Sequence, residues 1–334
     1  MTAGQSDFIC PACRSTVVTI ADGHNCAACN RSFPTIFGIP DFRLRGDQYL
    51  SLEEEREKAH KLHDYAQDHD FASLVSFYYS ITDDVPEKLA PVFAGYVLKA
   101  PERSAPALKA LAPEGGRSLL DLGCGSGGAL VAARDTFSER TGVDIALRWL
   151  VIAQKRLQEL GVDAKLVCAA AEALPFREGV FSHVMAADLL ENARSPEVAV
   201  GAAASILEEG GRFYVSSSNG RWIGPHPATR IWAAGLLPER IRKPMLERRH
   251  GVDILRAVTF VSSGVVRRMA ARAGMRRVMA APLTVDKVRV EGRSAAFRSL
   301  AAAYSMLAKL PVSRMLLVAA GPVFESLFVK ENAK

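Results

Sequence analysis

Short apolar runs alternate with segments of helix length from residue 118 to residue 217, and this alternation constrains the fold more than any other feature of the chain. The apolar runs lie at 119–122, 141–143, 165–169, 181–187 and 212–217. Segments of helix length lie at 127–137, 146–160 and 196–208. Strands that alternate with helices form a parallel sheet whose two faces are covered. The sequence therefore predicts an α/β fold with helices on both faces of a central sheet.

A glycine-rich turn follows the first apolar run. Residues 119–128 read Leu-Leu-Asp-Leu-Gly-Cys-Gly-Ser-Gly-Gly, and glycines in such a turn let a ligand approach the backbone closely. Gly123, Gly125 and Gly128 match the dinucleotide pattern G-x-G-x-x-G, which keeps a nicotinamide or flavin protein as one interpretation. Asp121 argues against it, because its carboxylate would repel a pyrophosphate. S-adenosylmethionine carries an ammonium and a sulfonium but no phosphate, so the pattern favours that cofactor.

Later segments add to this interpretation. The second strand ends at Asp144, 21 positions after Gly123, where an acid accepts hydrogen bonds from ribose hydroxyls. Residues 171–176 read Ala-Glu-Ala-Leu-Pro-Phe after the third strand, and the fourth strand begins at Phe181. Together, residues 116–217 resemble the class I S-adenosylmethionine-dependent methyltransferases of the group with a Glu-Ala-Leu-Pro-Phe segment. The resemblance implies a Rossmann-like methyltransferase sheet and an enzyme that transfers methyl groups.

The resemblance also implies a set of cofactor-binding residues. They are Asp121, Gly123, Gly125 and Gly127 near the methionine end, Asp144 at the ribose, Ile145 against the adenine, Ala171 and Glu172 at the adenine edge, and Asp188 after the fourth strand. Three positions depart from the usual family pattern. Ala170 and Ser182 stand where relatives usually have acids, and Asn192 stands where they usually have histidine. These changes lower the affinity that we expect for the cofactor without removing the site.

Four of the six cysteines lie within twenty residues, as Cys10-x2-Cys13 and Cys26-x2-Cys29. One tight turn of this spacing supplies two thiolates, and two such turns that meet supply four ligands to a metal. The alternatives are two disulfides or four separate thiols. The same cysteine spacing is also compatible with iron in place of zinc. Four thiolates leave zinc no open position, so we predict a structural zinc site that supplies much of the folding free energy of a small ribbon.

Residues 10–42 resemble the small zinc-ribbon proteins that activate tRNA and protein methyltransferases, and the ribbons fused in front of bacterial methyltransferases. We therefore predict a zinc ribbon at 1–45 and a helical connector and cap at 46–115. The methyltransferase domain is expected at 116–292, with an insert at about 218–260, and C-terminal helices at 293–334. Strand candidates inside these limits are 277–281 and 284–290, and residues 47–70 are expected to form a solvated helix.

The methyl acceptor is harder to predict. Open α/β sheets bind ligands at the carboxyl ends of their strands, and a base is needed only if the acceptor loses a proton. Candidates for that base are Asp188, Glu191 and Asn219 after strands four and five, and His226 and His250 in the insert, which could act as a lid. His183 is expected to be a packed neutral residue within a strand.

Charge in the insert region narrows the acceptor class. Residues 230–277 contain twelve Lys and Arg against three acids, whereas the whole chain carries a net charge of only +6. A basic segment over the active site would favour an anionic acceptor or an anionic membrane surface. Alternatively, these basic residues form only a solvated surface. Helical segments near 306–318 are expected to pack on the sheet in preference to lipid, and peripheral membrane contact stays a hypothesis.

Three functions fit these patterns. The preferred one is methylation of a small-molecule or lipid-linked metabolite, because the insert and the helices before the sheet can close a pocket. Some ribosomal RNA guanine methyltransferases also carry a four-cysteine ribbon, which keeps RNA as an alternative acceptor. The acidic connector disfavours this alternative, because it would repel the phosphates of RNA. A non-catalytic binding module with a degenerate methyltransferase fold is the third.

Composition sets the outer limits of these predictions. The chain has 334 residues, 49% of them hydrophobic and 23% charged, which indicates a globular protein with more than one folded part. No uncharged run approaches the ~18 residues of a membrane span, and the N-terminal residues do not match a secretory signal. We therefore expect a cytoplasmic protein with reduced cysteines, at the inner face of the membrane if it contacts lipid.

Overall fold

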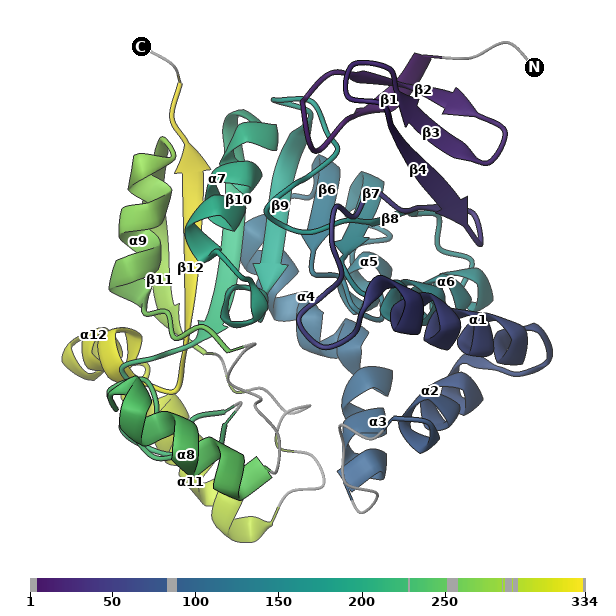
Figure 1. Cartoon of the computed structure of the whole chain (residues 1–334). Coiled ribbons are helices and arrows are strands. Elements are labelled where there is room, and N and C mark those ends of the chain that lie inside the picture. Colours follow the sequence, from purple (N-terminus) through teal and green to yellow (C-terminus); the bar gives the residue numbers. More distant parts are fainter. Residues whose placement is uncertain are drawn as a thin grey trace. The chain divides into compact units, whose positions relative to one another are not determined.

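The computed structural model describes residues 5–82, 89–227, 229–250, 258–283, 285, 290 and 294–332. Two compact units divide the chain, Met1–Val184 and Met185–Lys334, and Figure 1 shows the elements of each.

The first unit begins with a small antiparallel sheet that carries the cysteine turns. Its strands, in the spatial order β1-β2-β3-β4-β5, are β1 (Gln5–Ile9), β2 (Thr16–Ile20), β3 (Gly23–Cys26), β4 (Arg31–Ile36) and β5 (Ile39–Pro40). Its core is a few side chains, among them Val17, Phe33 and Phe42. Cys10 and Cys13 lie in the turn between β1 and β2, and Cys26 and Cys29 lie at the turn between β3 and β4. This is the arrangement that two Cys-x2-Cys turns predict.

Four helices follow the small sheet in the described part of the chain. They are α1 (Leu52–Asp68), α2 (Phe71–Ser80), α3 (Ala90–Leu98) and α4 (Ala100–Leu111). Ser51 begins α1 with a capping box to Glu54, and Asp70 caps α2, because both side chains accept from the backbone N–H three residues on. The expectation that α1 is wholly solvated is wrong. Glu55 is buried and pairs with Arg148, which also donates to Asp47 at 2.9 Å.

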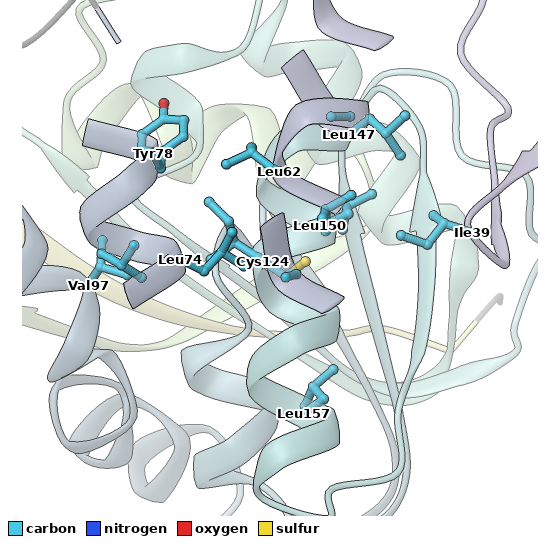
Figure 2. Close-up of a cluster of buried hydrophobic side chains, with 14 of the residues drawn as sticks. Ile39, Leu62, Leu74, Tyr78, Val97, Cys124, Leu147, Leu150 and Leu157 are labelled. Atoms are coloured by element: carbon cyan, nitrogen blue, oxygen red, sulfur yellow. The ribbon is translucent and has the colours of Figure 1, made fainter. Parts of the chain in front are cut away.

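Three parallel strands form the first unit's part of the main sheet. These strands are β6 (Gly116–Leu122), β7 (Phe137–Asp144) and β8 (Lys165–Cys168), with α5 (Gly128–Ala132) and α6 (Leu147–Glu159) between them. Helix α6 buries Leu147, Leu150 and Leu157, which join side chains of α1 and α2 in one apolar cluster (Figure 2). The glycine loop and the N-terminal helices are therefore held by the same core.

Strand β9 (Phe181–Ala187) crosses the boundary between the units, and the seven-stranded sheet has the order β11-β12-β10-β9-β6-β7-β8. The second unit contains η2 (Leu190–Asn192), α7 (Pro196–Ile206), β10 (Leu207–Ser218), α8 (Glu239–His250), α9 (Ser263–Arg272), β11 (Met275–Pro282), α11 (Ala295–Leu307), α12 (Pro311–Ala320) and β12 (Val323–Lys330). The predicted α/β fold is confirmed, and the sheet is mixed rather than wholly parallel, because β12 runs antiparallel to β10 and β11.

The C-terminal part of the chain corrects two expectations. C-terminal helices were predicted at 293–334, and the structure has α11 and α12 only up to Ala320, since β12 is a strand. The strand predicted at 277–281 is β11, whereas most of the candidate at 284–290 lies outside the described residues. Among the described residues no single helix is long and apolar enough to cross a membrane. Helices α11 and α12 meet that test only as a pair, bent by 114° at their junction.

Candidate functional site

The glycine loop after β6 has a backbone that only glycine adopts easily. Gly123, Gly125 and Gly127 have φ of +79°, +48° and +74°, in the left-handed region. The N–H groups of Gly123 and Cys124 donate to the Val143 carbonyl at 2.8 and 3.0 Å, which ties the loop to β7. Apart from its two chain neighbours, no described residue has an atom within 4 Å of the point where a Cβ on Gly125 would sit, so the backbone there faces open space.

Asp144 closes this loop from the end of β7. Its two carboxylate oxygens accept from the N–H groups of Gly125 and Ala146, each at 2.9 Å. The sequence analysis predicted an acid for the ribose at this position. It did not predict that the same carboxylate joins the glycine loop to the start of α6, so Asp144 has a structural contact that could be seen only in the fold.

Asp121 lies in β6, two residues before Gly123, and is 4% exposed. Burial, and then the charge of Asp144, raise the pKa of Asp121 to about 7. A bound cation would favour its ionised form. The site is therefore electrostatically suited to the ammonium and sulfonium of S-adenosylmethionine rather than to a pyrophosphate.

The loop after β8 brings Ala171 and Glu172 into the same unit as the glycine loop. Ala169 N–H donates to the Asp144 carbonyl at 3.0 Å, and Ala171 is buried. Glu172 pairs with Arg45 at 3.8 Å between Oε2 and Nη2. The first unit thus contains all the predicted cofactor residues except Asp188, which follows β9 in the second unit.

Sequence analysis missed three arginines near these loops: Arg14, Arg43 and Arg45. Arg43 is buried, binds both oxygens of Asp41 at 2.8 Å and donates from Nη1 to the Ile145 carbonyl at 3.2 Å. The contact of Arg43 with Ile145, like those of Arg14 with Leu174 and of Arg45 with Glu172, joins segments more than a hundred residues apart, so local patterns carried no signal for it.

The four ribbon cysteines form one cluster. Their Sγ atoms all lie within 4.8 Å of one another, with Cys10 to Cys29 at 3.6 Å and Cys13 to Cys26 at 3.5 Å. Four sulfurs at ~2.3 Å around tetrahedral zinc lie about 3.8 Å apart, so this cluster fits such an ion. A bound zinc would be held by thiolates alone and would serve the ribbon as a structural ion.

In the second unit, Asp188 and Glu191 lie next to each other after β9. Asp188 has a left-handed φ of +54° and accepts from Ser216 Oγ at 3.4 Å. Glu191 is buried and accepts from Ser217 Oγ at 2.6 Å and Ser218 N–H at 3.1 Å. Burial, followed by the neighbouring charge of Asp188, raises the pKa of Glu191 to about 7. Glu191 is the candidate base whose pKa is best matched to neutral pH.

The histidine candidates lie in different surroundings. His226 is 1% exposed and contacts Phe260, with ring centroids 5.0 Å apart and ring planes tilted by 59°. Burial and then Arg242 lower its pKa to about 4, so its ring is neutral at pH 7. His250 ends α8, and its side chain lies outside the described part of the structure. His183 is half-buried in β9, where Nδ1 lies 3.0 Å from Ser182 Oγ.

Comparison with known proteins bears on this geometry. Residues 120–215, from β6 through most of β10, match the family model described as a methyltransferase domain. This segment is similar to a methyltransferase domain. The ubiquinone biosynthesis O-methyltransferase of Chromobacterium violaceum is 32% identical over 105 residues, which are 31% of this chain and 45% of that protein. The corresponding enzyme of Idiomarina loihiensis is also 32% identical, over 31% of this chain and 43% of its own length.

The chain therefore spans less than half the length of the curated relatives that it matches. A solved structure of phosphoethanolamine N-methyltransferase 2 from Haemonchus contortus, in complex with S-adenosyl-L-methionine, is 17% identical with a TM-score of 0.48, and the comparison covers 74% of this chain and 59% of that one. The glycine loop, Asp121 and Asp144 lie within the segment that matches the family model.

Proposed function

We propose that the protein transfers a methyl group from S-adenosylmethionine to a small-molecule or lipid-linked metabolite. The observation that carries this proposal is the acid-edged glycine loop of the methyltransferase domain, where Asp121 and Asp144 lie around a left-handed glycine turn that faces open space. The cofactor supplies a methyl group on a positively charged sulfur, and the transfer is an in-line displacement. The protein's main task is then to orient the acceptor and exclude water.

Each predicted cofactor residue has a role in this proposal. Asp121 and the glycines hold the methionine end, Asp144 accepts from the ribose, and Ile145 and the Ala171–Glu172 turn hold the adenine. Asp188 contributes from the end of β9. Zinc at the four cysteines keeps the ribbon folded and takes no part in the transfer.

Two facts support the acceptor class. The relatives that match this segment are named ubiquinone biosynthesis O-methyltransferases, so their names give an oxygen atom as the methyl acceptor. Glu191 has a pKa near 7 and lies beside Asp188, so it can take the proton that a hydroxyl loses during methylation. We therefore assign Glu191 as the base, in preference to the neutral His226.

Titration calorimetry with S-adenosylhomocysteine tests the cofactor site. We expect a Kd in the micromolar range at pH 8 and about tenfold weaker binding at pH 6. The sign follows from Asp121: its ionised form binds the cofactor ammonium, and below its pKa of about 7 a proton must first be released. The Asp121→Asn variant is expected to bind more weakly and to lose this pH dependence. Absence of both heat and thermal shift would overturn the proposal.

Transfer of a labelled methyl group tests the acceptor class. The purified protein is incubated with labelled S-adenosylmethionine and either an organic extract of cells or total RNA. We expect label in the organic-soluble product. Label in RNA, lost steeply as salt rises, would assign the RNA function instead. Cofactor binding without any transfer would favour a non-catalytic module.

A further inference from the structure

The first cysteine turn of the ribbon is hydrogen-bonded to the loop that carries Ala171 and Glu172. Arg14 directly follows Cys13, and its Nη1 and Nη2 donate to the carbonyls of Leu174 and Phe176 at 2.9 and 3.0 Å. Ile9 directly precedes Cys10, and its N–H donates to the Pro175 carbonyl at 3.0 Å. Three consecutive loop carbonyls are therefore held by the two residues that flank the Cys10–Cys13 turn.

The chain just beyond the ribbon holds the same region from another direction. Phe42 N–H donates to the Cys168 carbonyl at the end of β8 at 2.8 Å. Arg43 donates to the Ile145 carbonyl, and Arg45 pairs with Glu172. Both loops assigned to the adenosine part of the cofactor thus take hydrogen bonds from residues 9–45.

The conformation of Arg14 depends on the cysteine turn. Its φ is +63°, a left-handed value that a non-glycine residue adopts only when its surroundings impose it. Its N–H donates to the Cys10 carbonyl at 2.9 Å, which fixes the turn that a metal at Cys10 and Cys13 would hold. Inside the cofactor loop, Ala173 N–H donates to Ala170, whereas the carbonyls of 174–176 bond to the ribbon.

We propose that Arg14 is a positioning residue that couples the metal-binding turn to the affinity of the cofactor site. The metal fixes the Cys10–Cys13 turn, the turn aims the Arg14 guanidinium, and the guanidinium holds residues 174–176 so that Ala171 and Glu172 stay in place for adenine. This inference rests on the proposed function, because it takes the Ala171–Glu172 turn as part of the cofactor site.

The test compares Arg14→Met with Arg31→Met. Arg31 is a matched control, an exposed ribbon arginine for which the described structure shows no side-chain hydrogen bond or ion pair. Metal content, binding of S-adenosylhomocysteine, and hydrogen exchange of the backbone amides of 169–176 are measured for each. We expect Arg14→Met to keep its metal, to bind about tenfold more weakly, and to exchange faster in this loop without ligand. Arg14→Lys should recover binding only in part, because one ammonium cannot reproduce the planar guanidinium fork on two carbonyls.

The outcomes separate this inference from the proposed function. If Arg14→Met binds like the Arg31→Met control, or its loop exchanges no faster, the positioning role is overturned. If the unaltered protein fails to bind S-adenosylhomocysteine, the proposed function fails, while the exchange measurement still reports whether Arg14 holds the loop.

An independent observation concerns α12, whose apolar stripe faces away from the protein. Val312, Met315 and Leu316 are 74%, 73% and 65% exposed, and Ala319 is exposed at the next position of the same stripe. No residue of α12 is buried. Its other side lies toward β11, where Arg314 donates to the Ala280 carbonyl at 3.3 Å. An amphipathic helix of a soluble protein normally buries such a stripe, so we expect this face to contact another surface.

The preceding helix continues the exposed apolar surface. Ala301 is the only residue of α11 that is buried, and Leu300, Met306 and Leu310 are exposed. Lys309 and Leu310 lie at the 114° bend between the two helices. We name this surface the α11–α12 face; the opposite side of α12 contacts β11 and β12, as the expected packing on the sheet requires.

Charge indicates what covers the α11–α12 face. Residues 294–324 contain no acid and three bases, of which Arg298 and Lys309 are exposed and Arg314, also exposed, donates to the Ala280 carbonyl of β11. Apolar side chains flanked by bases match an anionic bilayer surface, where the apolar groups enter the headgroup boundary and the bases contact the lipid phosphates. We also infer that the α11–α12 face binds the surface of an anionic membrane. This inference does not depend on methyl transfer.

Flotation with vesicles tests it. We expect the protein to float with vesicles of equal parts phosphatidylglycerol and phosphatidylcholine, and to bind pure phosphatidylcholine at least tenfold more weakly. The double variant Met315→Gln, Leu316→Gln should lose binding, while Val198→Gln, an exposed apolar residue of α7, should not. Equal binding by the double variant would overturn the inference. Self-association that the double variant abolishes, with no vesicle binding, would assign the face to a second copy of the chain and also overturn it.

Discussion

Replacing Asp144 by alanine is expected to weaken binding of S-adenosylhomocysteine about a hundredfold. The carboxylate accepts from the N–H groups of Gly125 and Ala146 and, in the proposed function, from the ribose as well. A hydrogen bond to a charged group contributes roughly 1.5–3 kcal/mol, and about 2.7 kcal/mol corresponds to a hundredfold change in Kd. Loss of the loop contacts and of the ribose contact together reaches this size. Calorimetry at pH 8 measures the change.

The control for this prediction is Asp135→Asn, which changes an exposed acid in the same unit that pairs with Arg134. It should leave the affinity unchanged. Asp144→Asn keeps the shape of the side chain but replaces one acceptor oxygen by an NH2 donor. This variant should therefore bind with intermediate affinity. A melting curve and circular dichroism show whether each variant is folded. A folded Asp144→Ala protein with normal affinity would remove Asp144 from the cofactor site.

The central strands and the glycine loop could be predicted because their signals are local. Strands β6 to β10 follow from apolar runs, and the left-handed positions at Gly123, Gly125 and Gly127 need the residue that the sequence places there. The cysteine cluster is local in the same sense, since each Cys-x2-Cys turn brings two sulfurs together by its own geometry.

Strand β12 could not be predicted in this way. Residues 323–330 are apolar on both sides, with Phe324, Leu327 and Phe328 buried, and a short run of that kind has no clear period of two or 3.6. Residues 323–330 form a strand because they pair with β10 and β11, which lie on either side of them and begin more than forty residues earlier in the chain.

The contacts of Arg14, Arg43 and Arg148 were missed for a related reason. Arg148 pairs with Asp47 and Glu55, which a local view treats as acids of a solvated helix. A guanidinium can reach any acceptor that the fold brings near it, so its partner is set by tertiary structure rather than by neighbours in sequence. Glu191, the base in the proposed function, could not be singled out for a similar reason, because its raised pKa comes from burial.

Removing the metal from the four cysteines is expected to have the other large effect. The ribbon has short strands and a small core, so the metal must supply much of its folding free energy. We expect about one zinc per chain in the purified protein. After a strong chelator removes it, the ribbon should lose its slow hydrogen exchange, and S-adenosylhomocysteine should bind at least as weakly as it does to Arg14→Met.

The genetic counterpart of chelation is Cys26→Ser, with Ser32→Ala as a control in the same ribbon. Cys26 is buried in the cluster, so a serine there leaves three thiolates and a weak fourth ligand, and the zinc content should fall. Because Ile9 and Arg14 hold the carbonyls of residues 174–176, unfolding of the ribbon should increase exchange in residues 169–176 as well. A metal-free protein that melts, exchanges and binds as before would show that the ribbon folds without metal and that its state does not reach the cofactor loop.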